Sequence, residues 1–247
     1  NASETAKYVK AVVRAMKESK MSSALKHFPG YGNNADTHTG SSYDMRPYEQ
    51  FLNNDFIPFE AGIESGAEII LVSHNVIDAI DSSLPASLSK SVIDILRNQL
   101  KFTGIIMTDD LSMGAITELQ SEFSPEVMAV LAGNDMLVVT DFESSFKTLL
   151  GAAKAEEISV ERIDESVVRI LQSYVENDKH FLHSYYLCKY SLHNLLNFLT
   201  DSVSWFFLPI ISALISSNIS FRRSSPTEST NFFIPFSLIL EATSFMQ

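Results

Sequence analysis

The chain has 247 residues, 45% of them hydrophobic, so it can bury the core of one large domain or two small ones. Its formal net charge of −12 argues against a nucleic-acid-binding protein, because such proteins carry basic patches. A single cysteine, Cys188, excludes an internal disulfide framework and a cysteine-rich zinc site.

The chain begins at Asn1, without Met, inside a segment that is typical of a helix. No basic-then-apolar signal segment is present. We therefore expect that an N-terminal part is missing. The sequence leaves the localisation open between the cytoplasm and the cell envelope.

Helical spacing and short apolar runs alternate along residues 1–175. Three runs rich in Ile, Val and Leu predict strands, at 67–73, 104–110 and 135–140, and the short run at 22–26 is taken as a fourth. Apolar residues at helical spacing predict helices, at 3–19 with Ser3 as N-cap, 47–66 with a break at Pro58, 87–100, 125–132, and 159–175 with Ser159 as N-cap.

This order gives four helix-then-strand units and a closing helix. Strands that are apolar throughout favour a parallel sheet covered on both faces. A (β/α)₈ TIM barrel and a doubly wound sheet both fit that pattern. A complete barrel needs eight strands, so four strands make half a barrel at most.

Composition changes near Asp178. Residues 179–247 contain no glycine, yet they hold nine of the 17 phenylalanines and the only Trp, Trp205. We predict a catalytic domain over 1–178 and an irregular or helical apolar tail over 179–247 that is not part of it. The longest apolar run of the tail, 203–215, is shorter than the roughly 20 residues that cross a bilayer, so a membrane anchor is the less favoured reading.

Polar residues follow the predicted strands: Lys26 and His27, His74, Asp109 with Asp110, and Thr140 with Asp141. In both candidate folds the carboxyl ends of the strands carry the chemistry. Asp109 would place a carboxylate there, and alternation along the strand sends Asp110 to the other side. The alternative is that the pair caps a helix beginning in "DDLSMGAI".

Asp36 and His38 are one residue apart in the glycine-flanked loop "KHFPGYGNNADTH". In an extended stretch they lie on one side, so the carboxylate can hold the imidazole and raise its basicity. The alternative is a surface Asx-turn with a solvated His. A metal site built from His27, His38, His74, Asp36 and Asp109 is a third reading, although no pair has the His-x-x-x-His spacing.

"KHFPGYGNNADTH" and "GIIMTDDLSMGAI" together resemble the family-3 glycoside hydrolases, most of all the bacterial β-N-acetylhexosaminidase branch. The pieces "LVSHNVI", "PASLSKSVIDILRNQLKFTG", "AGNDMLVVT" and "ERIDESVVRIL" follow in the order of that family. The resemblance covers about residues 1–175 and leaves the tail unmatched. It implies that the domain is the C-terminal half of a (β/α)₈ barrel.

The resemblance also implies roles. Asp109 would be the nucleophile, and Asp36 with His38 would be the acid/base dyad on a mobile loop. Lys26 and His27 would hold hydroxyls of the sugar, and His74 would line the same pocket. The family's loop usually reads G-H-G, whereas this chain has Gly30-Tyr31-Gly32 followed by Asn33 in place of an acid.

The implied activity is that of a retaining exo-β-N-acetylhexosaminidase acting on peptidoglycan or chitin-type oligosaccharides. No cofactor or metal is implied, and the expected partner is a carbohydrate. Two alternatives stay open. One is a family-3 phosphorylase, in which phosphate replaces water, and the other is a truncated, inactive fragment.

Overall fold

The computed structural model of the chain describes residues 1–119, 121–177 and 232–235. Apart from 232–235, the segment 179–247 lies outside the described residues. The predictions about its apolar run and about the boundary of the catalytic domain therefore stay predictions. Within the described part, none of the helices combines the length and the apolar character needed to cross a bilayer.

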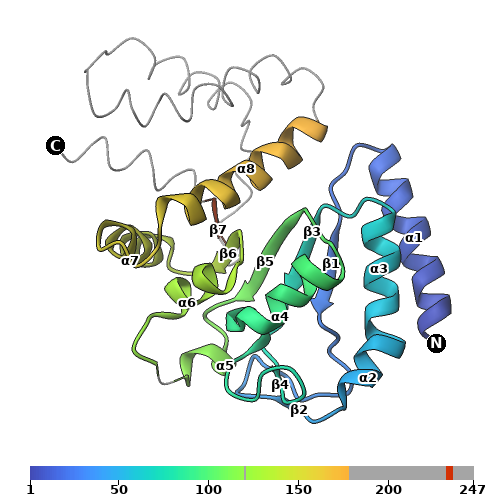
Figure 1. The fold of residues 1–247 in the computed structure, drawn as a ribbon, viewed down its shortest axis with the longest axis horizontal. Helices are drawn as coiled ribbons and strands as arrows, with labels where there is room; N and C mark the ends of the chain where they lie inside the picture. Colours follow the sequence, from blue (N-terminus) through green and yellow to red (C-terminus); the bar gives the residue numbers. More distant parts are fainter. Residues whose placement is uncertain (120, 178–231, 236–247) are drawn as a thin grey trace, which may run out of the picture. The chain divides into compact units, whose positions relative to one another are not determined.

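A five-stranded sheet in the order β1-β3-β5-β6-β7 is the centre of the described fold (Figure 1). Strands β1 (Ala24–Phe28), β3 (Ile69–Val72), β5 (Ile105–Asp110) and β6 (Met136–Val139) run parallel. Strands β3, β5 and β6 lie within the predicted ranges, whereas β1 is shifted by two residues from the predicted 22–26. Strand β7 (Phe232–Pro235) pairs antiparallel with β6. A separate parallel pair joins β2 (Tyr43–Asp44) to β4 (Val76–Ile77).

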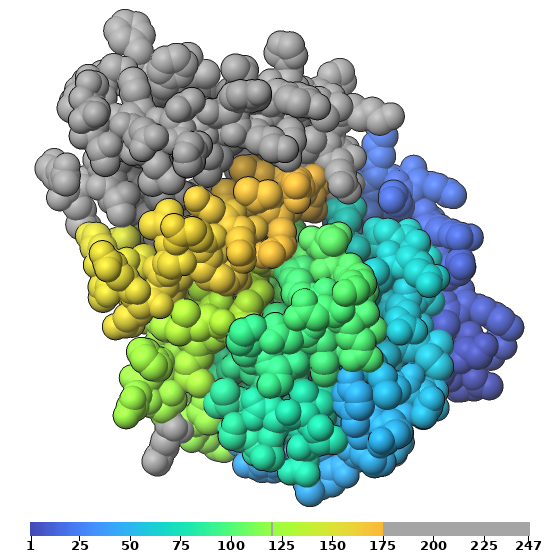
Figure 2. Space-filling view, viewed as in Figure 1, coloured from blue at the N-terminus to red at the C-terminus, as the bar shows by residue number. Residues whose placement is uncertain are grey.

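Helices connect the parallel strands. The longer ones are α1 (Ala2–Glu18), α3 (Phe56–Glu64), α6 (Pro125–Ala132), α7 (Phe142–Lys154) and α8 (Val160–Asn177). The shorter ones are α2 (Tyr48–Gln50), η1 (Phe51–Asp55), η2 (Ala86–Leu88), α4 (Lys90–Asp94), η3 (Ile95–Gln99) and α5 (Gly114–Thr117). Helix α1 packs beside α3, as the dark-blue and cyan surfaces of Figure 2 show.

Local chemistry explains where these helices begin and end. The Ser124 hydroxyl accepts from the Val127 N–H, Pro125 starts α6, and Gly133 ends it at φ +119°. Ser159 caps α8 as predicted, since its Oγ accepts from the Arg162 N–H at 3.2 Å. The prediction for α1 is wrong by two residues, because Asn1 is the cap and accepts from the Ser3 N–H.

The predicted helix over 47–66 is not interrupted at Pro58, which lies inside α3. The irregular part comes earlier, as the π-helical turn η1. Proline cannot donate to the carbonyl four residues before it, and its ring crowds that carbonyl. For Pro58 that carbonyl belongs to Asn54, within η1, so the wide turn takes up the misfit.

Along β3, one face of the sheet is more deeply buried than the other. Ile70 and Val72 are fully buried, whereas Ile69 and Leu71 are half-buried. The buried face packs on α3 and α4 through a core that includes Phe28, Phe56, Phe59, Val92, Leu96 and Ile106. Along β5, by contrast, Ile105, Ile106, Met107 and Thr108 are all buried, so both faces are covered there, as the sequence predicts.

Candidate active site

The carboxyl ends of β1 and β5 bring His27 and Asp109 together. The His27 Nε2 atom lies 3.6 Å from Asp109 Oδ2, and both side chains are half-buried. Burial lowers the pKa of His27, and the negative charge of Asp109 acts against that shift without cancelling it. A neutral imidazole therefore faces the carboxylate.

Asp109 is held by its own strand end, where its Oδ1 accepts from the Asp110 N–H at 2.9 Å. Asp110 makes a tight local turn in which its Oδ1 accepts from the Ser112 N–H at 2.9 Å. Helix α5 begins later, at Gly114, and no side chain caps it. The helix-cap alternative for this acidic pair is therefore wrong.

Asp36 and His38 form the pair predicted from their spacing. The His38 Nδ1 atom lies 2.6 Å from Asp36 Oδ1, and the same oxygen accepts from the His38 N–H at 3.0 Å. Both side chains are exposed. The bond from the His38 N–H is that of an Asx-turn and the contact with Nδ1 is that of the predicted pair, so both predicted arrangements occur together. The hydrogen bond to Asp36 raises the pKa of His38, with smaller contributions from the charges of Asp109 and Asp110.

His74 is fully buried and both of its ring nitrogens have partners. Its Nε2 lies 3.0 Å from the Asp110 carbonyl oxygen, and its Nδ1 lies 2.7 Å from Ser87 Oγ. A carbonyl only accepts, so Nε2 carries the proton and Nδ1 accepts from the Ser87 hydroxyl. Burial lowers the pKa of His74, which agrees with a neutral ring. Its contacts support the end of β5, next to Asp109.

The loop between β1 and β2 is held at its base by Arg46, which the sequence reasoning missed. The Arg46 guanidinium donates to Asp44 at 2.7 Å, to Asp55 at 3.0 Å and to the Gly30 carbonyl at 3.2 Å. It also lies over the Phe51 ring, 4.4 Å from the centroid. The Asp44-x-Arg46 spacing after a glycine-rich loop was the one signal in the sequence that pointed to this ion pair.

The tip of that loop rests on the connection that follows Asp109. The Gly114 N–H donates to the His38 carbonyl and the Ala115 N–H to the Thr37 carbonyl, each at 3.2 Å. The loop of Asp36 and His38 is therefore joined by backbone hydrogen bonds to the start of α5, which follows the strand of Asp109.

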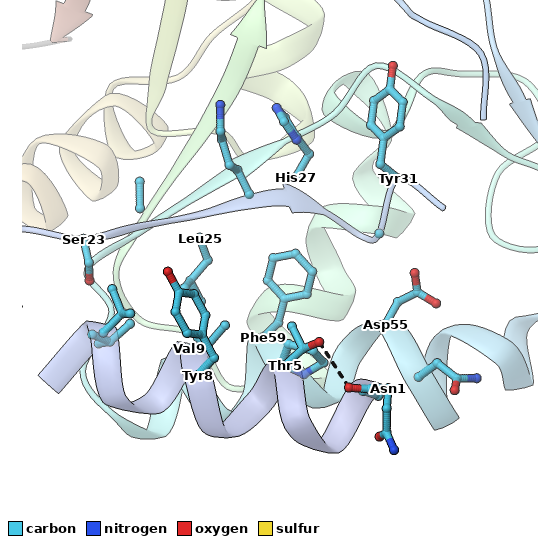
Figure 3. Close-up of a pocket in the computed structure, with 18 of the residues that line it drawn as sticks. Asn1, Thr5, Tyr8, Val9, Ser23, Leu25, His27, Tyr31, Asp55 and Phe59 are labelled. Atoms are coloured by element: carbon cyan, nitrogen blue, oxygen red, sulfur yellow. Dashed lines mark hydrogen bonds between the residues drawn. The ribbon is translucent and has the colours of Figure 1, made fainter. Parts of the chain in front are cut away.

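A cavity of about 650 Å³ runs along the free edge of β1, between that strand, α1 and α3. Lys26, His27 and Tyr31 line its rim, but Asp36, His38 and Asp109 do not line it. Figure 3 shows His27 and Tyr31 projecting on one side of β1, and Leu25 and Phe59 on the side of α1. The cavity is thus a groove beside the strand edge, and the side chains of Asp36, His38 and Asp109 lie outside it.

The structure brings the predicted residues together in two pairs, His27 with Asp109 and Asp36 with His38. Lys26 is exposed next to His27. Among the described residues, no three His, Cys, Asp or Glu side chains are grouped as a metal site would require.

Residues 1–173 match the model of the glycosyl hydrolase family 3 N-terminal domain. A β-hexosaminidase of Xanthomonas campestris pv. campestris (strain B100) is 37% identical over 111 residues, which is 44% of this chain and 34% of that protein. The chain thus spans about a third of the length of the curated relatives that it matches.

Solved structures agree with this assignment. A glycoside hydrolase family 3 β-N-acetylglucosaminidase from Paenibacillus sp. str. FPU-7 superposes with a TM-score of 0.64 at 31% identity, over 68% of this chain and 33% of that one. A β-glucoside phosphorylase superposes with a TM-score of 0.62 at 28% identity, over 68% and 33%. The predicted fold class, part of a (β/α)₈ barrel, is confirmed.

Proposed function

Since the chain belongs to glycosyl hydrolase family 3, we propose that it carries the catalytic groups of a retaining exo-β-N-acetylhexosaminidase. Its substrate class is glycans that end in a β-linked N-acetylglucosamine, such as peptidoglycan or chitin fragments. Relatives named β-hexosaminidase and β-N-acetylglucosaminidase support this class. The observation that carries the proposal is the 2.6 Å contact between Asp36 and His38, on a loop that is hydrogen-bonded to the start of α5, shortly after Asp109.

The reaction proceeds in two steps. Asp109 attacks the anomeric carbon while His38 gives its proton to the departing glycosidic oxygen, which leaves a glycosyl ester on Asp109. His38, now neutral, then takes a proton from a water molecule that attacks the same carbon and releases Asp109. Two inversions give net retention of configuration.

The two pairs suit these roles. Asp36 raises the pKa of His38, so the imidazole holds the proton that the first step needs. Lys26 and His27 lie at the end of β1 beside Asp109, where they would bind hydroxyls of the sugar. His74 would act on this site through the end of β5.

A phosphorylase is the second candidate, because the chain is also similar to a β-glucoside phosphorylase. In that reaction inorganic phosphate attacks the glycosyl ester in place of water. An imidazole beside the anomeric carbon repels a phosphate anion less than a carboxylate would.

Trapping the intermediate tests the proposal. The 247-residue chain is incubated with an N-acetylglucosaminide whose fluorine substituent slows the second step. The protein is then digested, and the masses of its peptides are measured by mass spectrometry. We expect the peptide that contains Asp109 to gain one glycosyl group. Asp109→Asn should abolish the gain, whereas Asp110→Asn should keep it, because an amide oxygen can still accept from the Ser112 N–H.

A chain that unfolds cooperatively yet shows no adduct, beside a full-length relative that is labelled, would contradict the proposal and favour the inactive-fragment alternative. Repeating turnover with and without inorganic phosphate separates the two enzymes. A hydrolase releases the free sugar in both cases, whereas a phosphorylase releases sugar 1-phosphate, which ³¹P NMR detects.

A further inference from the structure

Tyr31 makes a set of contacts with the loop of Asp36 and His38 that its sequence position alone does not suggest. Its hydroxyl oxygen accepts from the Thr37 N–H at 3.0 Å and lies 3.1 Å from the Ala35 carbonyl oxygen. It also lies 3.1 Å from Thr37 Oγ1. A phenol can donate one hydrogen bond and accept two, so the hydroxyl donates to Ala35 and accepts twice from Thr37.

Thr37 is the residue between the two members of the dyad. It is 1% exposed, whereas Asp36 and His38 on either side point to solvent. Its carbonyl accepts from the Ala115 N–H at 3.2 Å. Thr37 is therefore held by Tyr31 on one side and by the start of α5 on the other. Its backbone fixes the positions of the neighbouring residues, Asp36 and His38.

The Tyr31 ring has a second neighbour. Its centroid lies 5.7 Å from that of His27, at an interplanar angle of 61°, which is an edge-to-face contact. In addition, the Asn34 side chain donates both to the Tyr31 carbonyl at 2.9 Å and to Asp44 at 2.7 Å. Tyr31 thus connects the end of β1, the loop and the Arg46 ion pair.

We propose that Tyr31 is a positioning residue for the Asp36–His38 dyad: its hydroxyl fixes Thr37, and its ring ties the loop to His27. The positioning itself is a property of the folded chain. Its catalytic meaning rests on the proposed function, in which His38 is the acid/base.

The first measurement needs no turnover. Tyr31→Phe keeps the ring and removes only the hydroxyl, and Tyr48→Phe is the matched control, since the Tyr48 hydroxyl donates to Gln99 at 2.6 Å and does not contact this loop. We expect amide hydrogen exchange at Thr37 to be about 5-fold faster or more in Tyr31→Phe, the factor that one lost hydrogen bond gives. Exchange at Thr37 should be unchanged in Tyr48→Phe.

An NMR titration of the imidazole follows the dyad directly. In wild type the Asp36 hydrogen bond raises the pKa of His38. A loosened loop separates the two groups for part of the time, so the pKa of His38 should fall toward its ordinary value in Tyr31→Phe and stay unchanged in Tyr48→Phe. A merely structural role for Tyr31 would lower the unfolding temperature without moving this pKa.

Turnover gives the third readout. With an N-acetylglucosaminide of 4-nitrophenol, the leaving group departs with little protonation, whereas a sugar leaving group needs the acid. Tyr31→Phe should lower kcat by about 10-fold on the disaccharide and much less on the aryl glycoside. Equal Thr37 exchange and an equal His38 pKa in wild type and Tyr31→Phe would overturn the positioning role. A wild-type chain inactive on both substrates would instead reject the proposed function, with the NMR result still deciding about Tyr31.

Discussion

The carbonyl oxygen of His38 accepts a hydrogen bond from the Gly114 N–H, with 3.2 Å between nitrogen and oxygen. Gly114 opens α5 on the connection that follows Asp109. The backbone of His38, the proposed acid/base, is thus hydrogen-bonded to the segment that follows Asp109, the proposed nucleophile. Side chains are not tolerated at this contact, because a Cβ on Gly114 would lie 3.0 Å from the His38 oxygen and 2.9 Å from the Gly40 nitrogen.

Gly114→Ala should therefore lower activity, and it should also cost some stability. The new Cβ would meet backbone atoms of Gly40 and His38, which cannot rotate away as the end of a flexible side chain can. The loop must move by a few tenths of an ångström, and a misplaced acid/base lowers kcat by about 10-fold or more. The measurement is kcat on a chitin disaccharide together with the thermal unfolding midpoint.

Gly151→Ala is the control for this variant, because a Cβ there meets no atom within 4 Å and the residue lies inside α7. It should gain the helix propensity and leave kcat unchanged. Full activity of Gly114→Ala would show that the contact with His38 does not position the loop.

Asp36→Asn should move the pH dependence of the reaction. Asp36 raises the pKa of His38, so wild-type His38 keeps its proton to higher pH than an isolated imidazole would. Removing the charge lowers that pKa, and the alkaline limb of kcat on a disaccharide should shift to lower pH. The pH profile of kcat and an NMR titration of His38 both measure the shift.

Stability is the control for Asp36→Asn. The dyad is exposed, so Asp36→Asn should leave the unfolding midpoint nearly unchanged. An alkaline limb at the wild-type position, in a variant whose His38 pKa has fallen, would show that another group supplies the proton.

Ser87→Ala should destabilise the fold. It leaves the Nδ1 atom of the fully buried His74 without a donor, at a cost of about 1–3 kcal/mol. Chemical denaturation measures this loss. The control is Ser144→Ala, at an exposed position of α7, which should change the free energy of unfolding little. Equal stabilities of the two variants would mean that His74 finds another partner.

Arg46→Met should destabilise the chain by about 3 kcal/mol at neutral pH, because it leaves Asp44 buried without its cation. Burial acts to raise the pKa of Asp44, but hydrogen bonds from Arg46 and Asn34 together outweigh it and lower the pKa. A lowered carboxyl pKa stabilises the fold above the unfolded value of about 3.8, and the gain is lost as the pH falls through the folded value.

The difference in unfolding free energy between wild type and Arg46→Met should therefore be largest above pH 4 or so and shrink in more acidic solution. Arg14→Met, on the exposed side of α1, removes the same charge as a control and should show a small difference at every pH. A pH-independent loss in Arg46→Met would point to its packing on Phe51 as the main contribution.

The sequence could predict what depends on neighbouring residues. Short Ile- and Val-rich runs identified three of the four parallel strands, and the order of the elements placed β1 before them. The spacing of Asp36 and His38 predicted their contact. Helix α7 was missed, although Phe142, Phe146, Leu149 and Leu150 recur at helical spacing and are packed in the core.

Contacts between distant segments could not be predicted. Gly114 contacts the His38 carbonyl, 76 positions earlier in the chain, and this contact has no signature in the sequence. The contacts of the Tyr31 hydroxyl with Ala35 and Thr37 stay within one loop, but an irregular loop has no period that would predict them. The family resemblance implied that His74 lines the sugar pocket. The hydrogen bonds of its two ring nitrogens, with Ser87 and with the Asp110 carbonyl, are contacts that the sequence did not predict.

The π-helical turn η1 determines the directions in which Phe51 and Asp55 point. Each residue of an α-helix advances the chain by about 100°, and a π-helical turn contains one residue more than an α-helical path would need. Phe51 and Asp55, at the two ends of this turn, both contact Arg46. Deleting a single residue between them would restore regular winding and swing one of the two contacts off the guanidinium. The number of residues between Phe51 and Asp55 is thus constrained. In relatives aligned to this segment, we expect substitutions to be tolerated more readily than one-residue gaps.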